Sequence, residues 1–164
     1  MSELPNFIID RTFNAPPNKV WRAWTEPDLL ARWYGPNVET IIHEFNLRPG
    51  GIWKNEMSMG DFSDLSISTF IEVLPEKQLI WHQSSADSDW NITANPMMPD
   101  WPRTVVTNVS FTDRGDQTDV RLVWTPHEAS DAELACFNEA VSNFSGGWET
   151  GFSIMDDVLA EIAN

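Results

Sequence analysis

Residues 130–162 read SDAELACFNEAVSNFSGGWETGFSIMDDVLAEI and carry the clearest periodicity in the chain. Apolar residues recur every three or four positions, at 134, 137, 141, 144, 148, 152, 155, 159 and 162, which predicts a helix with one apolar face. Ser130 and Glu133 form a capping box at its start. One straight helix would measure roughly 48 Å, whereas a compact domain of this size is about 40 Å across. We therefore expect a break at Gly146-Gly147 and a main helix over about 145–162.

The chain before this helix alternates between apolar and polar residues in short runs, which is typical of strands. We expect strands at 5–15, 38–47, 52–57, 65–74, 78–84, 103–111 and 118–124. Strands segregated from helices indicate an α+β fold with an antiparallel sheet. The long helix is the one element able to cover that sheet. The prediction is a helix-grip fold, in which a curved six- to seven-stranded antiparallel sheet wraps around the C-terminal helix.

Two short helices are expected after the first strand, where they would close one end of the sheet. Pro16-Pro17 opens the first, and the second covers 26–33. Thr25 followed by Asp28 predicts a capping pattern for the second helix, and Gly35-Pro36 predicts its end.

Composition limits the classes of function. A length of 164 residues fits one domain over 1–164, and 41% apolar with 21% charged residues is a soluble globular composition. The net charge is −15 and the ten Lys and Arg residues are scattered, so neither nucleic acid nor a membrane surface is an expected partner. Cys136 is the single cysteine, and no secretion signal is visible at the N-terminus. We expect a cytoplasmic protein.

Four motifs carry a family resemblance. They are APPNKVWRAWTEPDLLARWYGP (15–36), LRPGGIW (47–53), FIEVLPEKQLIW (70–81) and GGWETGFSIMDDVLAEI (146–162). Together they resemble the SRPBCC (START/Bet v1-like) superfamily, and more narrowly the homologues of the activator of heat-shock protein 90 ATPase. The resemblance implies a helix-grip fold with a hydrophobic cavity. Relatives include lipid carriers, cyclases and chaperone partners, and relatives often pair, so a homodimer is possible. The segment 85–102 departs from the family by being longer and richer in Trp, Met and Pro, and it is placed where a cavity-mouth loop could lie.

Nine Trp and nine Phe against one Tyr exceed what a small core ordinarily uses, so some rings are expected to line a cavity. For any single ring, plain core packing is the better interpretation. A one-residue slip of register would invert each strand face, so which face points inward stays open. The candidate ligand-binding residues are Trp33, Tyr34, Phe45, Trp53, Trp81, Trp90, Trp101, Asn108, Phe144, Trp148, Phe152 and Met155.

Few residues point to catalysis. His43 is expected on one strand face with Ile41, Phe45 and Leu47, and His82 follows Trp81. A lone histidine on an apolar face is usually a hydrogen-bonded core or rim residue, so His43, His82 and Glu56 are only weak catalytic candidates. No spacing typical of a zinc, calcium, phosphate-loop or dinucleotide site is present, and we expect neither a metal nor a cofactor.

Three functions follow from these observations. The first is binding of a small hydrophobic or aromatic molecule between the sheet and the long helix. The alternative is a protein-interaction domain that associates with a chaperone, and a weaker alternative is a cyclase or hydrolase acting in the cavity. An aromatic cavity above about 300 Å³ would favour the first, and a filled core would not. The identity of the ligand is not encoded in any motif.

Overall fold

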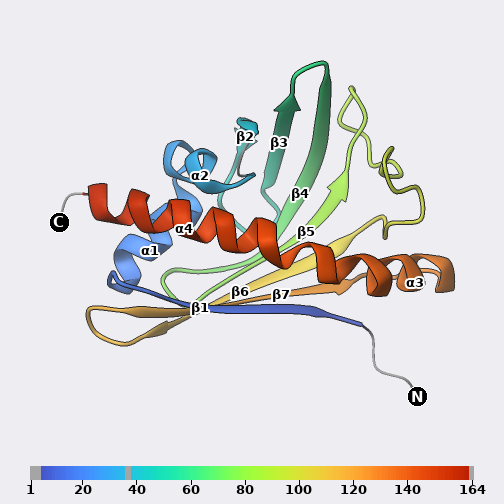
Figure 1. Ribbon diagram of the computed structural model, residues 1–164. Helices are drawn as coiled ribbons and strands as arrows, with labels where there is room; N and C mark the ends of the chain where they lie inside the picture. The colour runs from blue at the N-terminus through green and yellow to red at the C-terminus, as the bar shows by residue number, and fades with distance from the viewer. Residues whose placement is uncertain (1–4, 36–37, 163–164) are drawn as a thin grey trace.

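Seven antiparallel strands form one curved sheet in a computed structural model that describes residues 5–35 and 38–162 (Figure 1). The strands lie in the order β1-β7-β6-β5-β4-β3-β2. The elements are β1 (Phe7–Phe13), α1 (Pro17–Thr25), α2 (Pro27–Trp33), β2 (Glu39–Phe45), β3 (Ile52–Met59), β4 (Phe62–Leu74), β5 (Gln78–Ser85), β6 (Val105–Asp113), β7 (Thr118–Pro126), α3 (Asp131–Ala140) and α4 (Ser145–Glu161).

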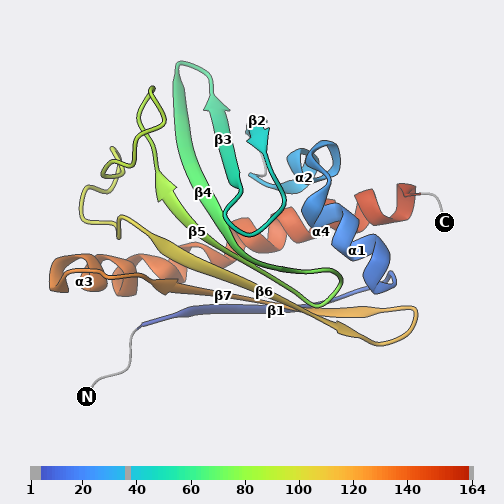
Figure 2. The same ribbon diagram turned by 180° about the vertical axis from the view of Figure 1, so that it is seen from behind.

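Helix α4 runs along the concave side of the sheet, which we call the inner face (Figures 1 and 2). Helices α1 and α2 lie at one end of α4, while α3 and the connection between β5 and β6 lie at the other end. The predicted α+β helix-grip fold is therefore confirmed. No helix in the described part of the chain is long and apolar enough to cross a membrane.

The core lies between the inner face and α4. Phe13 from β1 meets Phe152 from α4 with ring centroids 5.4 Å apart, and both side chains are fully buried. Arg11, also on the inner face of β1, pairs with Asp156 of α4. Edge strand and helix are thus joined by both apolar and polar contacts.

The C-terminal helical tract breaks slightly earlier than expected. The capping box of Ser130 and Glu133 is confirmed at the start of α3. The break is a 3-10 turn over Val141–Asn143, so the prediction of a break at Gly146-Gly147 is wrong. Both glycines lie in the first turn of α4. Their N–H groups have no intrahelical acceptor there in any case, which makes the position tolerant of weak helix formers.

The predicted cap of α2 is also wrong. Glu26 is the N-cap residue and makes no side-chain capping bond, while Pro27 occupies the first turn. The Thr25 hydroxyl instead donates to the Trp21 carbonyl at 2.6 Å within α1. Proline at the first helical position has its φ fixed near the helical value. It therefore favours the start of α2 without a capping hydrogen bond. Gly35 follows α2 with a φ of +77°, whereas Pro36 lies outside the described residues.

A β-bulge in β2 changes which of its side chains face inward. Ile42 pairs with Asn55 but Glu44 pairs with Lys54, so His43 is the extra residue of the bulge. The extra residue interrupts the alternation of side chains, so residues after the bulge point to the opposite face from the one that simple alternation would give them. Phe45, opposite Trp53, therefore faces inward. Ile41 and His43 face outward, and the expectation that they share a face with Phe45 is wrong.

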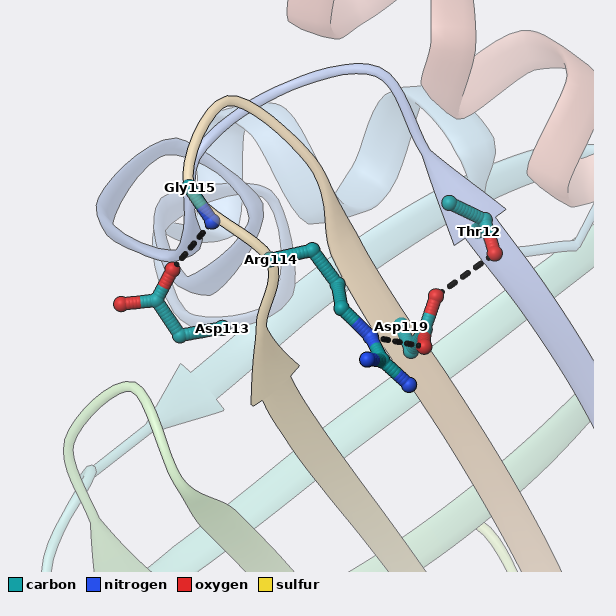
Figure 3. Close-up of polar contacts among 5 residues, drawn as sticks. All are labelled: Thr12, Asp113, Arg114, Gly115 and Asp119. Atoms are coloured by element: carbon teal, nitrogen blue, oxygen red, sulfur yellow. Dashed lines mark hydrogen bonds and ion pairs between the residues drawn. The ribbon is translucent and has the colours of Figure 1, made fainter.

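The hairpin between β6 and β7 is fixed by polar side chains (Figure 3). Asp113 accepts a hydrogen bond from the backbone N–H of Gly115 at 2.7 Å within the turn. Arg114 donates to Asp119 at 2.7 Å, and the other oxygen of Asp119 accepts from the hydroxyl of Thr12 at 2.6 Å. The turn is thereby tied to the neighbouring edge strand β1.

Candidate functional site

A pocket of about 280 Å³ lies between the inner face and the first half of α4. Five aromatic side chains line it: Trp33, Tyr34, Trp124, Phe144 and Trp148. Its remaining lining consists of Met57, Asp64, Gln83 and three glycines, Gly35, Gly147 and Gly151. The volume is just below the roughly 300 Å³ at which ligand sites begin. The molecule therefore has a small pocket beside a largely filled core.

A smaller hollow of about 80 Å³ adjoins this pocket. The two share Met57, Asp64, Gln83 and Trp124 in their linings. The smaller hollow extends toward the connection between β5 and β6, which contributes Asn95 and Trp101. That irregular segment therefore reaches the site from the side opposite α1 and α2.

The end of α2 places two rings in the pocket wall. The Trp33 indole N–H donates to the carbonyl of Ala23 at 2.9 Å, and its ring lies 4.6 Å from that of Trp24. The ring of Tyr34 lies 5.1 Å from Trp53 on the sheet and 5.9 Å from Trp148 on α4. Both rings are buried and are held by neighbours on three elements.

The opposite wall is formed by rings from α4, β7 and the segment that precedes α4. Trp148 and Trp124 meet nearly edge to face, with centroids 5.6 Å apart at 80°. Phe144 lies 5.5 Å from Trp124, and Trp101 lies 5.3 Å from Phe144. These contacts, together with that of Tyr34 and Trp148, make one continuous aromatic wall.

Two polar side chains from the inner face enter this apolar surrounding. Gln83 accepts hydrogen bonds through Oε1 from the Tyr34 hydroxyl at 3.2 Å and from the Trp81 indole at 3.3 Å. Asp64 pairs across strands with Met57, and burial raises the pKa of its carboxyl group. Burial also raises the pKa of the Tyr34 phenol, to above its usual range. The described lining of the pocket thus includes one carboxyl group, one amide and one phenol.

Some buried polar atoms on the inner face have no hydrogen-bond partner within the described residues. They include both amide atoms of Asn55, the hydroxyl of Thr107 and the indole N–H of Trp124. Buried polar groups are normally paired, so each is a candidate contact for a bound molecule or water. Trp124 contributes its ring to the pocket lining, while its indole nitrogen is buried.

The structure divides the predicted site residues into three groups. Trp33, Tyr34, Phe144 and Trp148 line the pocket, and Trp101 lines the adjoining hollow. Phe45, Trp53, Trp81, Phe152 and Met155 pack in or against the core. His43, Glu56, His82, Trp90 and Asn108 lie on the outer face of the sheet or over it, and the expectation that they face the cavity is wrong.

The outer-face residues have partners of their own. His43 Nε2 lies 2.8 Å from Glu56 Oε1, and the ring of Trp90 lies 5.4 Å from that of His43. Asn108 accepts a hydrogen bond from Gln78 at 3.1 Å. His82 lies on the same outer side, where burial and a neighbouring imidazole lower its pKa. Because the sheet separates them from the pocket, none of these side chains can reach a molecule bound there.

Sequence reasoning missed Met57, Asp64, Gln83 and Trp124. Gln83 lies two residues beyond the inward-facing Trp81, so strand alternation could have found it. Asp64 was missed because the strand was expected to begin at residue 65, whereas β4 begins at Phe62. Within the described residues, no three His, Cys, Asp or Glu side chains are grouped so that they could hold a metal ion.

Comparisons with known proteins agree with this architecture. A family model described as Activator of Hsp90 ATPase homolog 1-like protein matches residues 14–160. The chain is similar to a solved structure from Staphylococcus epidermidis, with a TM-score of 0.79, 19% identity, and coverage of 100% of this chain and 94% of the other. It is also similar to protein Ms6760 from Mycobacterium smegmatis, with a TM-score of 0.77, 20% identity and coverage of 99% of both chains. At these identities, structural likeness establishes the fold alone. No curated protein matches the chain with significant similarity.

Proposed function

This chain belongs to the family of Activator of Hsp90 ATPase homolog 1-like proteins, and from that premise we propose that it binds a small hydrophobic or aromatic molecule between the sheet and α4. The observation that carries the proposal is the pocket lined by five rings and a few polar groups. Ligand sites combine apolar walls with a few polar groups that orient the ligand. Here Asp64 and Gln83 supply those groups.

The size of the pocket restricts the ligand. A volume of about 280 Å³ suits a compact ring system and leaves no room for a long acyl chain. The rings also favour a planar ligand, because aromatic pairs gain from edge-to-face and offset contacts. We therefore favour a small aromatic molecule over a lipid.

Blocking the pocket tests this proposal. A β-carbon added at Gly147, which lines the pocket, meets no atom within 4 Å, so a leucine there has space at the edge of the site. We expect Gly147→Leu to weaken binding of propylbenzene or indole by about tenfold or more, measured by tryptophan fluorescence and native mass spectrometry. Gly146→Leu is the matched control, since position 146 is equally open but lies outside the lining. An absence of saturable binding across aromatic and aliphatic probes would remove the proposal.

The second candidate is association with a chaperone. The family description points to it, and exposed apolar side chains on the outer side of the sheet, such as Ile8 and Ile71, favour a protein contact. A cytoplasmic location, which the single Cys136 supports, would allow it. The test is a pull-down with the chaperone and a measurement of its ATPase activity. The same experiment, run with size-exclusion chromatography, separates a chaperone contact from pairing of two copies of this chain.

Catalysis in the pocket is not part of this proposal. His43, His82 and Glu56, the weak candidates for a cyclase or hydrolase, lie on the far side of the sheet from the pocket. Asp64 and Tyr34 are the titratable groups in the described lining, and the pKa of each is raised.

A further inference from the structure

The charge of the pocket is unbalanced. Asp64 is the one carboxylate in the pocket lining and in that of the adjoining hollow, and neither lining contains a Lys, Arg or His among the described residues. None of the ion pairs within residues 5–35 and 38–162 involves Asp64. A carboxylate taken out of water is normally paired, because its charged form loses solvation energy. Among the described residues, no cationic side chain lies within ion-pair distance of this carboxylate.

The aromatic wall has the same electrostatic preference as the carboxylate. The faces of Trp and Tyr rings carry negative partial charge and attract a cation within about 6 Å of the centroid. Trp148 contacts both Tyr34 and Trp124, with ring centroids 5.9 and 5.6 Å away, so several rings surround one small volume. A cation in that volume would lie among these rings, with the Asp64 carboxylate in the same lining.

The negative net charge of the whole chain also favours a cationic ligand. The chain carries 25 acidic against 10 basic residues, for a net charge of −15. A surface of one sign raises the local concentration of ligands of the other sign. Anionic ligands are correspondingly disfavoured at a site whose one formal charge is negative.

We propose that the pocket binds a molecule in which an aromatic or apolar ring carries a protonated amine. Asp64 is the counter-charge of the amine, and the aromatic wall contacts the ring of the ligand. This inference rests on the proposed function and names its ligand class. The raised pKa of Asp64 agrees with it, since burial without a partner penalises the ionised carboxyl group and an arriving ammonium group would remove that penalty.

Three probes of similar shape test the inference by isothermal titration calorimetry at pH 7. They are 2-phenylethylamine, which is a cation, propylbenzene, which is neutral, and 3-phenylpropionate, which is an anion. We expect the wild-type protein to bind the amine about tenfold more tightly than propylbenzene, and 3-phenylpropionate not at all. This comparison needs no variant, so it does not depend on how a substitution folds.

Asp64→Asn then assigns the preference to one side chain. We expect it to lower affinity for the amine by about tenfold, so that the amine loses its advantage over propylbenzene. Asp61→Asn is the control, because Asp61 is exposed in the neighbouring turn and its loss changes the net charge equally. Equal wild-type affinity for amine and propylbenzene would overturn the inference and leave the proposed function standing, as would unchanged binding by Asp64→Asn. If none of the three probes binds, both this inference and the proposed function are rejected.

Discussion

The hydroxyl of Tyr34 donates a hydrogen bond of 3.2 Å to Gln83 Oε1 and so joins the end of α2 to the inner face of β5. Both residues line the pocket, and the same amide oxygen also accepts from the Trp81 indole. One side of the pocket is therefore positioned by a contact between segments that are 49 residues apart in the chain. Together with the contact between the Tyr34 and Trp53 rings, it holds the end of α2 against the sheet.

Replacing this hydroxyl tests that contact. Tyr34→Phe keeps the ring and removes the donor, while Gln83 Oε1 still accepts from Trp81. We expect the free energy of unfolding to fall by about 1 kcal/mol, the usual net value of one such bond. Urea denaturation followed by circular dichroism measures it. Unchanged stability would mean that the hydroxyl gains as much from water as from Gln83.

The alkaline titration of Tyr34 gives a second prediction. It is the single tyrosine of the chain, so the alkaline difference spectrum in the ultraviolet reports on this one phenol. Burial raises its pKa from an ordinary value of 10.0. The folded state therefore keeps its proton where the unfolded chain loses it, and stability falls as pH rises above 10. We expect tyrosinate absorbance to appear together with unfolding. Ionisation near pH 10 in a protein with native circular dichroism would contradict the burial of the phenol.

Asp64 gives a prediction at the other end of the pH range. Its pKa is raised by burial, so in the window above its ordinary value of 3.8 the native state binds more protons than the unfolded chain. The ionised carboxyl group therefore lowers stability at neutral pH, and this penalty disappears as pH falls below 3.8. We expect Asp64→Asn to be more stable than wild type at pH 7 and to lose that advantage in acid.

Denaturation of wild type and Asp64→Asn between about pH 3 and pH 8 checks this sign. Asp61→Asn separates the local effect from the change in net charge, because Asp61 is exposed. A stabilisation of equal size in both variants would assign the effect to general charge repulsion across the acidic surface. In that case the position of Asp64 in the pocket would be irrelevant to it.

The fold was predictable from the sequence because it depends on long patterns. The apolar positions from 134 to 162 and the run of alternating strands are each repeated many times, so errors at single residues do not matter. The family motifs add to this, since their order along the chain is maintained over almost its whole length.

The site was less predictable because it depends on which face of the sheet each single strand residue points to. One extra residue in β2 turns His43 outward and Phe45 inward, and no composition signal marks that bulge. Asp64 lies in a strand whose start, with Ser and Asp residues, resembles a turn. The rings at the start of α4 were easier to predict, because helical spacing places Phe144 and Trp148 on one face independently of the strand register.

Gly35 allows the cost of backbone strain to be separated from that of crowding in the pocket. It adopts a φ of +77° at the end of α2, and a β-carbon there would lie 2.8 Å from Thr40 Oγ1 and 2.9 Å from Met57 Cε. Gly60 adopts a similar φ of +78° in the β3–β4 turn, where a β-carbon would meet nothing within 4 Å. Gly60→Ala therefore measures the left-handed conformation alone, at about 1–2 kcal/mol.

We expect Gly35→Ala to cost more than Gly60→Ala in the free energy of unfolding, because Thr40 and Met57 must also move. The Thr40 hydroxyl donates to the carbonyl of Tyr34, and Met57 lines the pocket. Their displacement should also weaken binding of propylbenzene, which Gly60→Ala should leave unchanged. Urea denaturation and calorimetry measure the two effects. Equal losses of stability in both variants would show that Met57 and Thr40 can move aside at little cost. The pocket wall beside Tyr34 would then be more deformable than its packing indicates.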